Sequence, residues 1–180
     1  MSMHSLTGYG PLTAVLTVVL VLVIWFDMSQ KRIPNWLTVG GAMAALALRG
    51  FIGVEVLWAG LLGGVLGLAL GILLFAAGAM GAGDGKLVAT VGSCLGFGVF
   101  VQALPVMGVA GGLLALAVTA RNGTLLPTFL RFRELLFHIV SFGRIGERRT
   151  LAMPGAVTVP YGLAVVAGAA WGWLAWGPSL

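Results

Sequence analysis

Met80-Gly81-Ala82-Gly83-Asp84-Gly85-Lys86 is the stretch around which the chain is organised. It closes a long apolar run in which glycine recurs, and it carries one of only five acidic residues. A second acid, Asp27, closes the first apolar run in the same way. A carboxylate at the margin of a membrane helix is costly unless something uses it. We therefore predict that Asp27 and Asp84 meet and do chemistry together, on a scaffold that brings them to one side of a membrane.

The composition predicts an integral membrane protein. The 180 residues are 59% hydrophobic and only 8% charged, whereas a soluble domain usually carries about a quarter charged residues. We expect an all-α protein with a single membrane domain, residues 1–180, and roughly six transmembrane helices of about 20 residues each. The predicted spans are 9–26, 35–48, 56–80, 87–104, 106–120 and 155–176, with a polar loop at 121–154. Because Trp25-Phe26-Asp27 follows the first run instead of small residues, we expect a retained span and no signal peptide.

Proline and glycine place the predicted boundaries and contacts. Pro34 fixes φ for a helix start, so the second helix is expected to begin there, and Pro105 is expected to separate the fourth and fifth spans. Glycines in the third span recur every four residues, and such spacing lets a neighbouring helix pack closely. We interpret these glycines as plain helix packing. They are Gly60, Gly63, Gly64, Gly67 and Gly71.

The basic residues predict the orientation. A net charge of +5 could suggest nucleic-acid binding, but these residues lie between apolar runs, as expected of loops on the inner side of a membrane. With six spans, nine of the ten basic residues fall on one side, and only Arg49 lies outside. Both chain ends then face out, and Asp27 and Asp84 share the cytoplasmic margin. The inner residues are Lys31, Arg32, Lys86, Arg121, Arg131, Arg133, Arg144, Arg148 and Arg149.

The long inner loop contains apolar residues at helical spacing with arginines between them. We favour an amphipathic helix on the inner leaflet, where arginines meet anionic lipid head groups. A lid or docking surface for a substrate is the alternative. The apolar positions are Leu126, Phe129, Leu130, Leu136, Phe137 and Val140.

Two adjacent carboxylates indicate general acid–base chemistry. They cannot both be charged cheaply, so the pair shares a proton. The ionised member can take a proton from water while the protonated member polarises a peptide carbonyl. Gly81, Gly83 and Gly85 would let a substrate backbone approach. Lys86 either lowers the pKa of Asp84 or, as we favour, extends to the head groups.

Competing motifs fit poorly. A Walker loop needs glycine where Met80 stands and Ser or Thr where Leu87 stands. A dinucleotide fingerprint needs glycine at Lys86. We expect no catalytic role for His4 or His138, no metal and no cofactor. The single cysteine, Cys94, is expected to be a small core residue.

Three motifs together resemble the type IV prepilin peptidases, which are membrane aspartic proteases of the Gly-x-Gly-Asp class. Asp27 followed by Lys31-Arg32-Ile33-Pro34-Asn35 resembles the first-aspartate motif of that family. Met80 to Leu87 resembles the second-aspartate motif, and Val159-Pro160-Tyr161-Gly162 resembles the Pro-Tyr-Gly element near the last span. The resemblance extends from Asp27 to about Gly168.

The resemblance implies an enzyme of the bacterial or archaeal cell membrane that cleaves leaders from pilin-like precursors on the cytoplasmic side. Asp27 and Asp84 would be its catalytic pair. The substrate would be a short basic leader followed by an apolar helix, often cut after glycine. Longer family members carry paired Cys-x-x-Cys motifs and methylate the new N-terminus, and this chain has only Cys94. We therefore expect no methyltransferase activity, and a similarity to the compact branch serving tight-adherence (Flp-type) pili.

The sequence leaves two other functional interpretations open. Signal-peptide-peptidase and presenilin-type proteases share Gly-x-Gly-Asp, but they have more spans and a Pro-Ala-Leu element that is not found here. A non-enzymatic membrane subunit or small ion-coupled transporter could line an ion path with its acids. A transporter of this size often shows two similar halves, and the sequence has no clear repeat.

Overall fold

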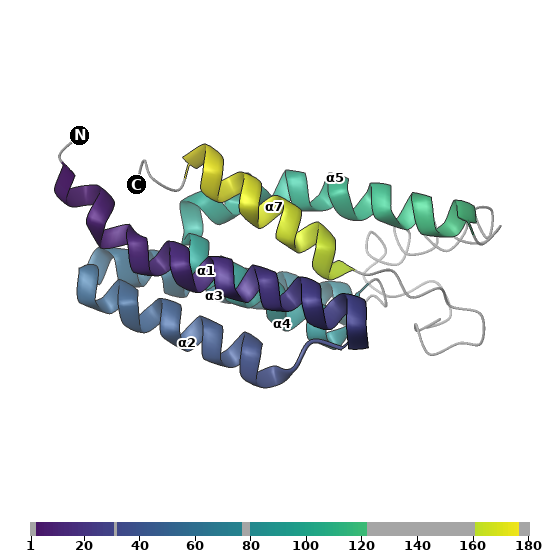
Figure 1. Cartoon of the computed structure of the whole chain (residues 1–180), viewed down its shortest axis with the longest axis horizontal. Helices are drawn as coiled ribbons and strands as arrows, with labels where there is room; N and C mark the ends of the chain where they lie inside the picture. Colours follow the sequence, from purple (N-terminus) through teal and green to yellow (C-terminus); the bar gives the residue numbers. More distant parts are fainter. Residues whose placement is uncertain (1–2, 31, 77–79, 122–160, 177–180) are drawn as a thin grey trace, which may run out of the picture.

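The computed structural model describes residues 3–30, 32–76, 80–121 and 161–176, and these residues form six helices (Figure 1). No strand occurs in these ranges, which confirms the predicted all-α class. The amphipathic helix predicted within 121–154 lies outside the described residues, as do Pro160 and the first part of the last predicted span. The helices are α1 (Met3–Gln30), α2 (Asn35–Ile52), α3 (Val54–Ala76), α4 (Ala82–Leu95), α5 (Phe97–Arg121) and α7 (Tyr161–Trp176).

The shortest helix, α4, forms the centre of the bundle. It contacts each of the other described helices, and nearly all of it from Gly85 to Leu95 is buried. At 1.5 Å per residue its 14 residues extend about 21 Å, which is less than a hydrocarbon core of about 30 Å. Asp84 lies in the first turn of this helix, just before its buried part.

The outer surface is apolar, as a membrane protein requires. Leu62, Val65 and Ile72 of α3 are each more than half exposed. Three segments are long and apolar enough to cross a membrane, namely Gly10–Gln30, Val54–Ala76 and Phe97–Arg121, and α7 is a shorter apolar helix. The described part of the chain is thus a helical membrane protein, while the count of six spans stays a prediction.

The break between the fourth and fifth helices was predicted wrongly. It falls at Gly96, and Pro105 lies inside a continuous α5. Gly96 has φ +78°, in the left-handed region that favours glycine. A proline inside an apolar helix removes one backbone hydrogen bond, which neighbouring helices in a membrane bundle tolerate. The fourth helix consequently ends at Leu95 instead of Leu104.

Other predicted bounds were too short. α1 continues to Gln30, so Asp27 lies on the last turns of a helix and not in the loop after it. α2 continues to Ile52, and only Gly53 separates it from α3. Glu55, which was expected in a connection, lies in the first turn of α3.

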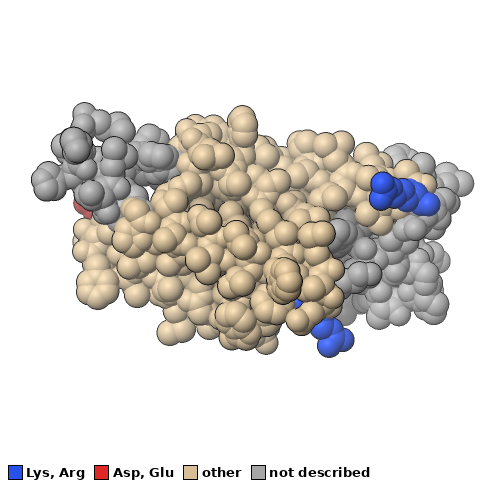
Figure 2. All heavy atoms as spheres, viewed as in Figure 1, with Lys and Arg blue, Asp and Glu red and all other residues tan. Residues whose placement is uncertain are grey.

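Charged side chains gather at the ends of the bundle. On the face shown in Figure 2, Lys and Arg atoms lie toward the end where α1 and α5 finish, and acidic atoms lie at the opposite end.

Arg49, predicted as the one basic residue on the outer side of the membrane, is buried in the bundle with 3% exposure. Its guanidinium donates hydrogen bonds to the carbonyl oxygens of Val56 (3.0 Å) and Cys94 (2.9 Å). It therefore joins the end of α2 to α3 and α4.

Candidate active site

The first carboxyl group, Asp27, lies on the buried side of α1. Asp27 is 9% exposed, and its Oδ2 has no hydrogen-bond partner among the described residues. The backbone N–H of Leu163, in the first turn of α7, interacts with the carboxyl group. A buried carboxyl oxygen without a partner is costly in a structural role, so Asp27 has the environment of a group that acts on something else.

The second carboxyl group, Asp84, lies in the first turn of α4. Gly81 is the N-cap of this helix, and its carbonyl oxygen accepts a hydrogen bond from the Gly85 N–H at 3.1 Å. Burial raises the pKa of Asp84 to about 6, with a further contribution from the negative charge of Asp27. A hydrogen bond from the Gly81 backbone N–H opposes this rise. The charge of Asp27 therefore lies within electrostatic range of the Asp84 carboxyl group.

The start of α7 forms the third side of the site. A Cβ atom placed on Gly162 would lie 2.7 Å from Asp27 Oδ2, so the absence of a side chain makes room for that carboxyl group. The neighbouring Tyr161 interacts electrostatically with Asp84, and its ring packs beside Gly111 of α5. From a distant part of the sequence, Gly162 thus lies against Asp27, and Tyr161 lies within electrostatic range of Asp84.

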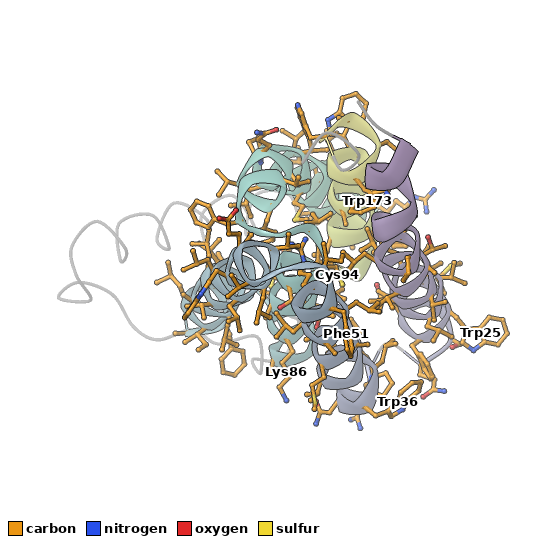
Figure 3. All side chains as sticks on the ribbon, turned by 90° about the vertical axis from the view of Figure 1, so that its left-hand side faces the viewer. Trp25, Trp36, Phe51, Lys86, Cys94 and Trp173 are labelled. Atoms are coloured by element: carbon orange, nitrogen blue, oxygen red, sulfur yellow. The ribbon has the colours of Figure 1, made fainter. Side chains whose placement is uncertain are left out.

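The Ile33-Pro34-Asn35 element closes the site from the side of α2. Pro34 is extended (φ −69°, ψ 141°) and is the N-cap of α2, as predicted. Ile33 lies beside Gly83, within 4 Å of where a Cβ would be. The Lys86 ammonium donates a hydrogen bond to Asn35 Oδ1 at 2.9 Å. Lys86 is exposed, and its side chain points away from the helices (Figure 3).

Aromatic residues surround this end of the bundle. Figure 3 shows Trp25 and Trp36 pointing away from the helices, and they are 67% and 62% exposed. Trp36 packs edge-on against Phe26, with ring centroids 6.0 Å apart, and so joins the end of α1 to the start of α2. Exposed tryptophans of this kind are typical of a membrane–water interface.

Sequence reasoning missed a polar contact behind the site. The Thr90 hydroxyl donates to the backbone oxygen of Thr38 at 2.8 Å and lies within hydrogen-bond distance of the Lys86 oxygen, at 2.9 Å. This contact fixes α2 against α4 one turn beyond Lys86. Threonine inside an apolar run often bonds to its own helix, so nothing in the sequence indicated a partner on another helix.

No group of three or more His, Cys, Asp or Glu residues in the described ranges could hold a metal ion. Cys94 is buried in the bundle, as expected, and lies in the last turn of α4, whereas Asp84 lies in the first. His138 lies outside the described residues.

Fold and site together define a class: a helical membrane protein in which two carboxyl groups from separate motifs lie within electrostatic range of each other. The model of the type IV leader peptidase family matches residues 14–120, more than half of the chain. The chain therefore belongs to the type IV leader peptidase family, a family of peptidases. The matched range contains Asp27 and Asp84, and Tyr161 and Gly162 lie beyond it. No curated protein and no solved structure matches the chain significantly.

The pKa of Asp84 predicts how substitution changes stability. Asp84→Asn is expected to raise the melting temperature at pH 8 and to leave it unchanged near pH 4. In the folded protein this carboxyl titrates near 6, above its ordinary value of 3.8. Folded protein therefore keeps a proton that the unfolded chain loses as the pH rises from about 4 to about 6, and stability falls across this window.

Asparagine cannot ionise, so the variant avoids that loss. Thermal unfolding of both proteins in the same detergent between pH 4 and 8 measures the effect. A melting-temperature difference that stays constant over this range would contradict the burial of Asp84 in its uncharged form.

Proposed function

We propose that the chain is an aspartic endopeptidase that removes the leader from type IV pilin-like precursors at the cytoplasmic face of the cell membrane, with Asp27 and Asp84 as its catalytic pair. The observation that carries this proposal is the electrostatic interaction of two carboxyl groups from distant motifs in a chain of the type IV leader peptidase family. Family membership favours this function over a transporter or a non-enzymatic subunit.

The proposed reaction uses the pair as acid and base. The ionised carboxyl takes a proton from a water molecule, whose oxygen adds to the peptide carbonyl carbon. The protonated carboxyl donates a hydrogen bond to the carbonyl oxygen as negative charge develops there. Transfer of a proton to the leaving nitrogen then breaks the C–N bond. Because the two acids interact, they titrate as a pair, and the reactive form carries one proton.

The position of the pair suits a substrate with a polar leader and an apolar helix. Asp84 precedes the buried part of α4, and Asp27 is close to the end of α1. A precursor helix lying in the membrane beside the bundle would present its leader junction at this end. Gly81 and Gly83 lack side chains beside Asp84, which leaves room for a substrate backbone. Membrane lipid and the precursor are therefore the proposed partners.

Two finer features of the proposal rest on the sequence. The excess of basic residues in the predicted inner segments supports the cytoplasmic side. The compact chain carries one cysteine, buried among apolar residues, and no paired Cys-x-x-Cys motif. We therefore propose that it serves the tight-adherence (Flp-type) branch and cleaves without methylating the product.

Cleavage of an Flp-type precursor by the protein in membranes tests the proposal. We expect a product that begins at the leader junction and carries a free, unmethylated N-terminal amine in its mass spectrum. A longer type IV precursor serves as the comparison substrate. Failure to cut either precursor would contradict the proposed function, whereas cleavage of the longer precursor alone would contradict only the Flp-type assignment. A methylated product would contradict the predicted loss of methyltransferase activity.

A further inference from the structure

Helix α3 lies against α4 along a line of buried glycines, and the last of them meets the turn that carries Asp84. A Cβ placed on Gly71 would lie 2.6 Å from the Gly85 oxygen and 2.7 Å from its Cα. In the reverse direction, a Cβ on Gly85 would lie 3.2 Å from the backbone of Gly71. Both neighbours are backbone atoms, so a methyl group is accommodated only if one helix moves.

The backbone contact between Gly71 and Gly85 is separated from the site by only one peptide unit. Gly85 directly follows Asp84, and its N–H closes the first turn of α4 onto Gly81. The Gly81 N–H in turn bonds to the Asp84 carboxyl group. A displacement of Gly85 away from α3 would thus move the segment that holds the carboxyl group opposite Asp27.

We infer that Gly71 is a positioning residue for the catalytic pair. Because Gly71 has no side chain, the start of α4 packs closely against α3, and this spacing sets the position of Asp84 relative to Asp27. The inference deepens the proposed function and rests on it. Gly71 touches neither carboxyl group, and it acts only through Gly85. A catalytic constellation tolerates about 0.5 Å of misplacement, and about 1 Å can lower a rate roughly 100-fold.

The same helix pair supplies a matched control. A Cβ on Gly63 of α3 would overlap the carbonyl oxygen of Gly92 in α4, so the packing conflict is at least as severe as at Gly71. Gly92 lies eight residues beyond Asp84, about 12 Å along the helix. Gly63→Ala therefore disturbs the same interface far from the acids. Gly40 of α2 is the control for replacing a helical glycine by alanine without a packing conflict, because a Cβ there meets no described atom within 4 Å.

The experiment measures kcat, KM and melting temperature for Gly71→Ala, Gly63→Ala and Gly40→Ala with one precursor in membranes. For Gly71→Ala we expect kcat to fall about 10- to 100-fold while KM changes less than about threefold, because binding of the precursor helix does not require the acids. Gly63→Ala should lower the melting temperature comparably and keep kcat within about threefold. Gly40→Ala should match the unsubstituted protein.

Equal kcat values for folded Gly71→Ala and Gly63→Ala would overturn the inference, because packing alone would then explain both. If Gly71→Ala does not insert, Gly85→Ala takes its place, since its Cβ meets the Gly71 backbone at a milder 3.2 Å. That variant is expected to show the same fall in kcat, and an unchanged kcat would again overturn the inference. Failure of the unsubstituted protein to cut any precursor would instead contradict the proposed function.

Discussion

Asp27→Asn and Asp84→Asn are each expected to lower the rate of precursor cleavage by at least about 10³-fold while the protein still inserts into the membrane. Asparagine keeps the shape of the side chain and removes the ionisable proton. The proposed reaction needs one protonated and one ionised carboxyl group at the same time, and either substitution leaves the pair without one of them. Cleavage rates at equal amounts of membrane-inserted protein measure the effect.

The double variant sharpens this prediction. Two groups that act as one unit give strongly non-additive losses, so the double variant should be no slower than the worse single variant. Glu55→Gln provides the control, because Glu55 is an exposed acid in the first turn of α3. Its rate should be unchanged. Near-normal cleavage by either asparagine variant would show that the acids are not the catalytic machinery.

The sequence predicted the helical class and the meeting of the two acids for related reasons. Long apolar runs with so few charged residues are stable only as helices within a membrane. Within such a chain, an acid at the end of an apolar run is unusual enough to identify a site. Placing Asp27 and Asp84 on one side followed from counting helices, and the charge of Asp27 contributes to the raised pKa of Asp84.

Helix bounds and interhelical contacts were harder to predict because they depend on neighbours. Pro105 is a strong local helix breaker, yet Gly96 forms the break, where the Arg49 guanidinium packs within 3.2 Å of the position a Cβ would occupy. Arg49 was assigned only to the outer side, because nothing in its local sequence reveals the carbonyl oxygens of Val56 and Cys94 to which it donates hydrogen bonds. Buried polar partners come from other helices, and periodicity in one helix does not identify them.

The glycines of α3 also show that spacing within one helix does not identify its contacts with another. Their four-residue spacing predicted close packing, and α3 does pack closely on α4 through them. The spacing carried no information on which glycine faces which backbone, so Gly63 and Gly71 looked equivalent. Only the arrangement in space shows that Gly71 meets the turn carrying Asp84 while Gly63 meets the far end of α4.

Gly162→Ala is expected to lower kcat by about 100-fold in a protein that still folds. The new methyl group would lie 2.7 Å from Asp27 Oδ2, 3.1 Å from its Cγ and 3.3 Å from a methyl group of Val23. Either the Asp27 carboxyl group rotates away from Asp84 or α7 moves outward, and both responses disturb the pair by an amount that catalysis does not tolerate. Overpacking of this kind also costs about 1–3 kcal/mol of stability. Cleavage kinetics and thermal unfolding of the same preparation measure the two effects.

A second glycine on α7 separates these effects. A Cβ on Gly172 would lie 2.8 Å from the Ala103 Cβ of α5, so Gly172→Ala overpacks the same helix far from Asp27. If displacement of α7 alone mattered, both variants would lose activity alike. We expect a similar fall in melting temperature but a large loss of kcat only for Gly162→Ala. Equal activities would contradict a direct role, whereas the expected difference would make the first turn of α7, beyond the matched residues 14–120, part of the active site.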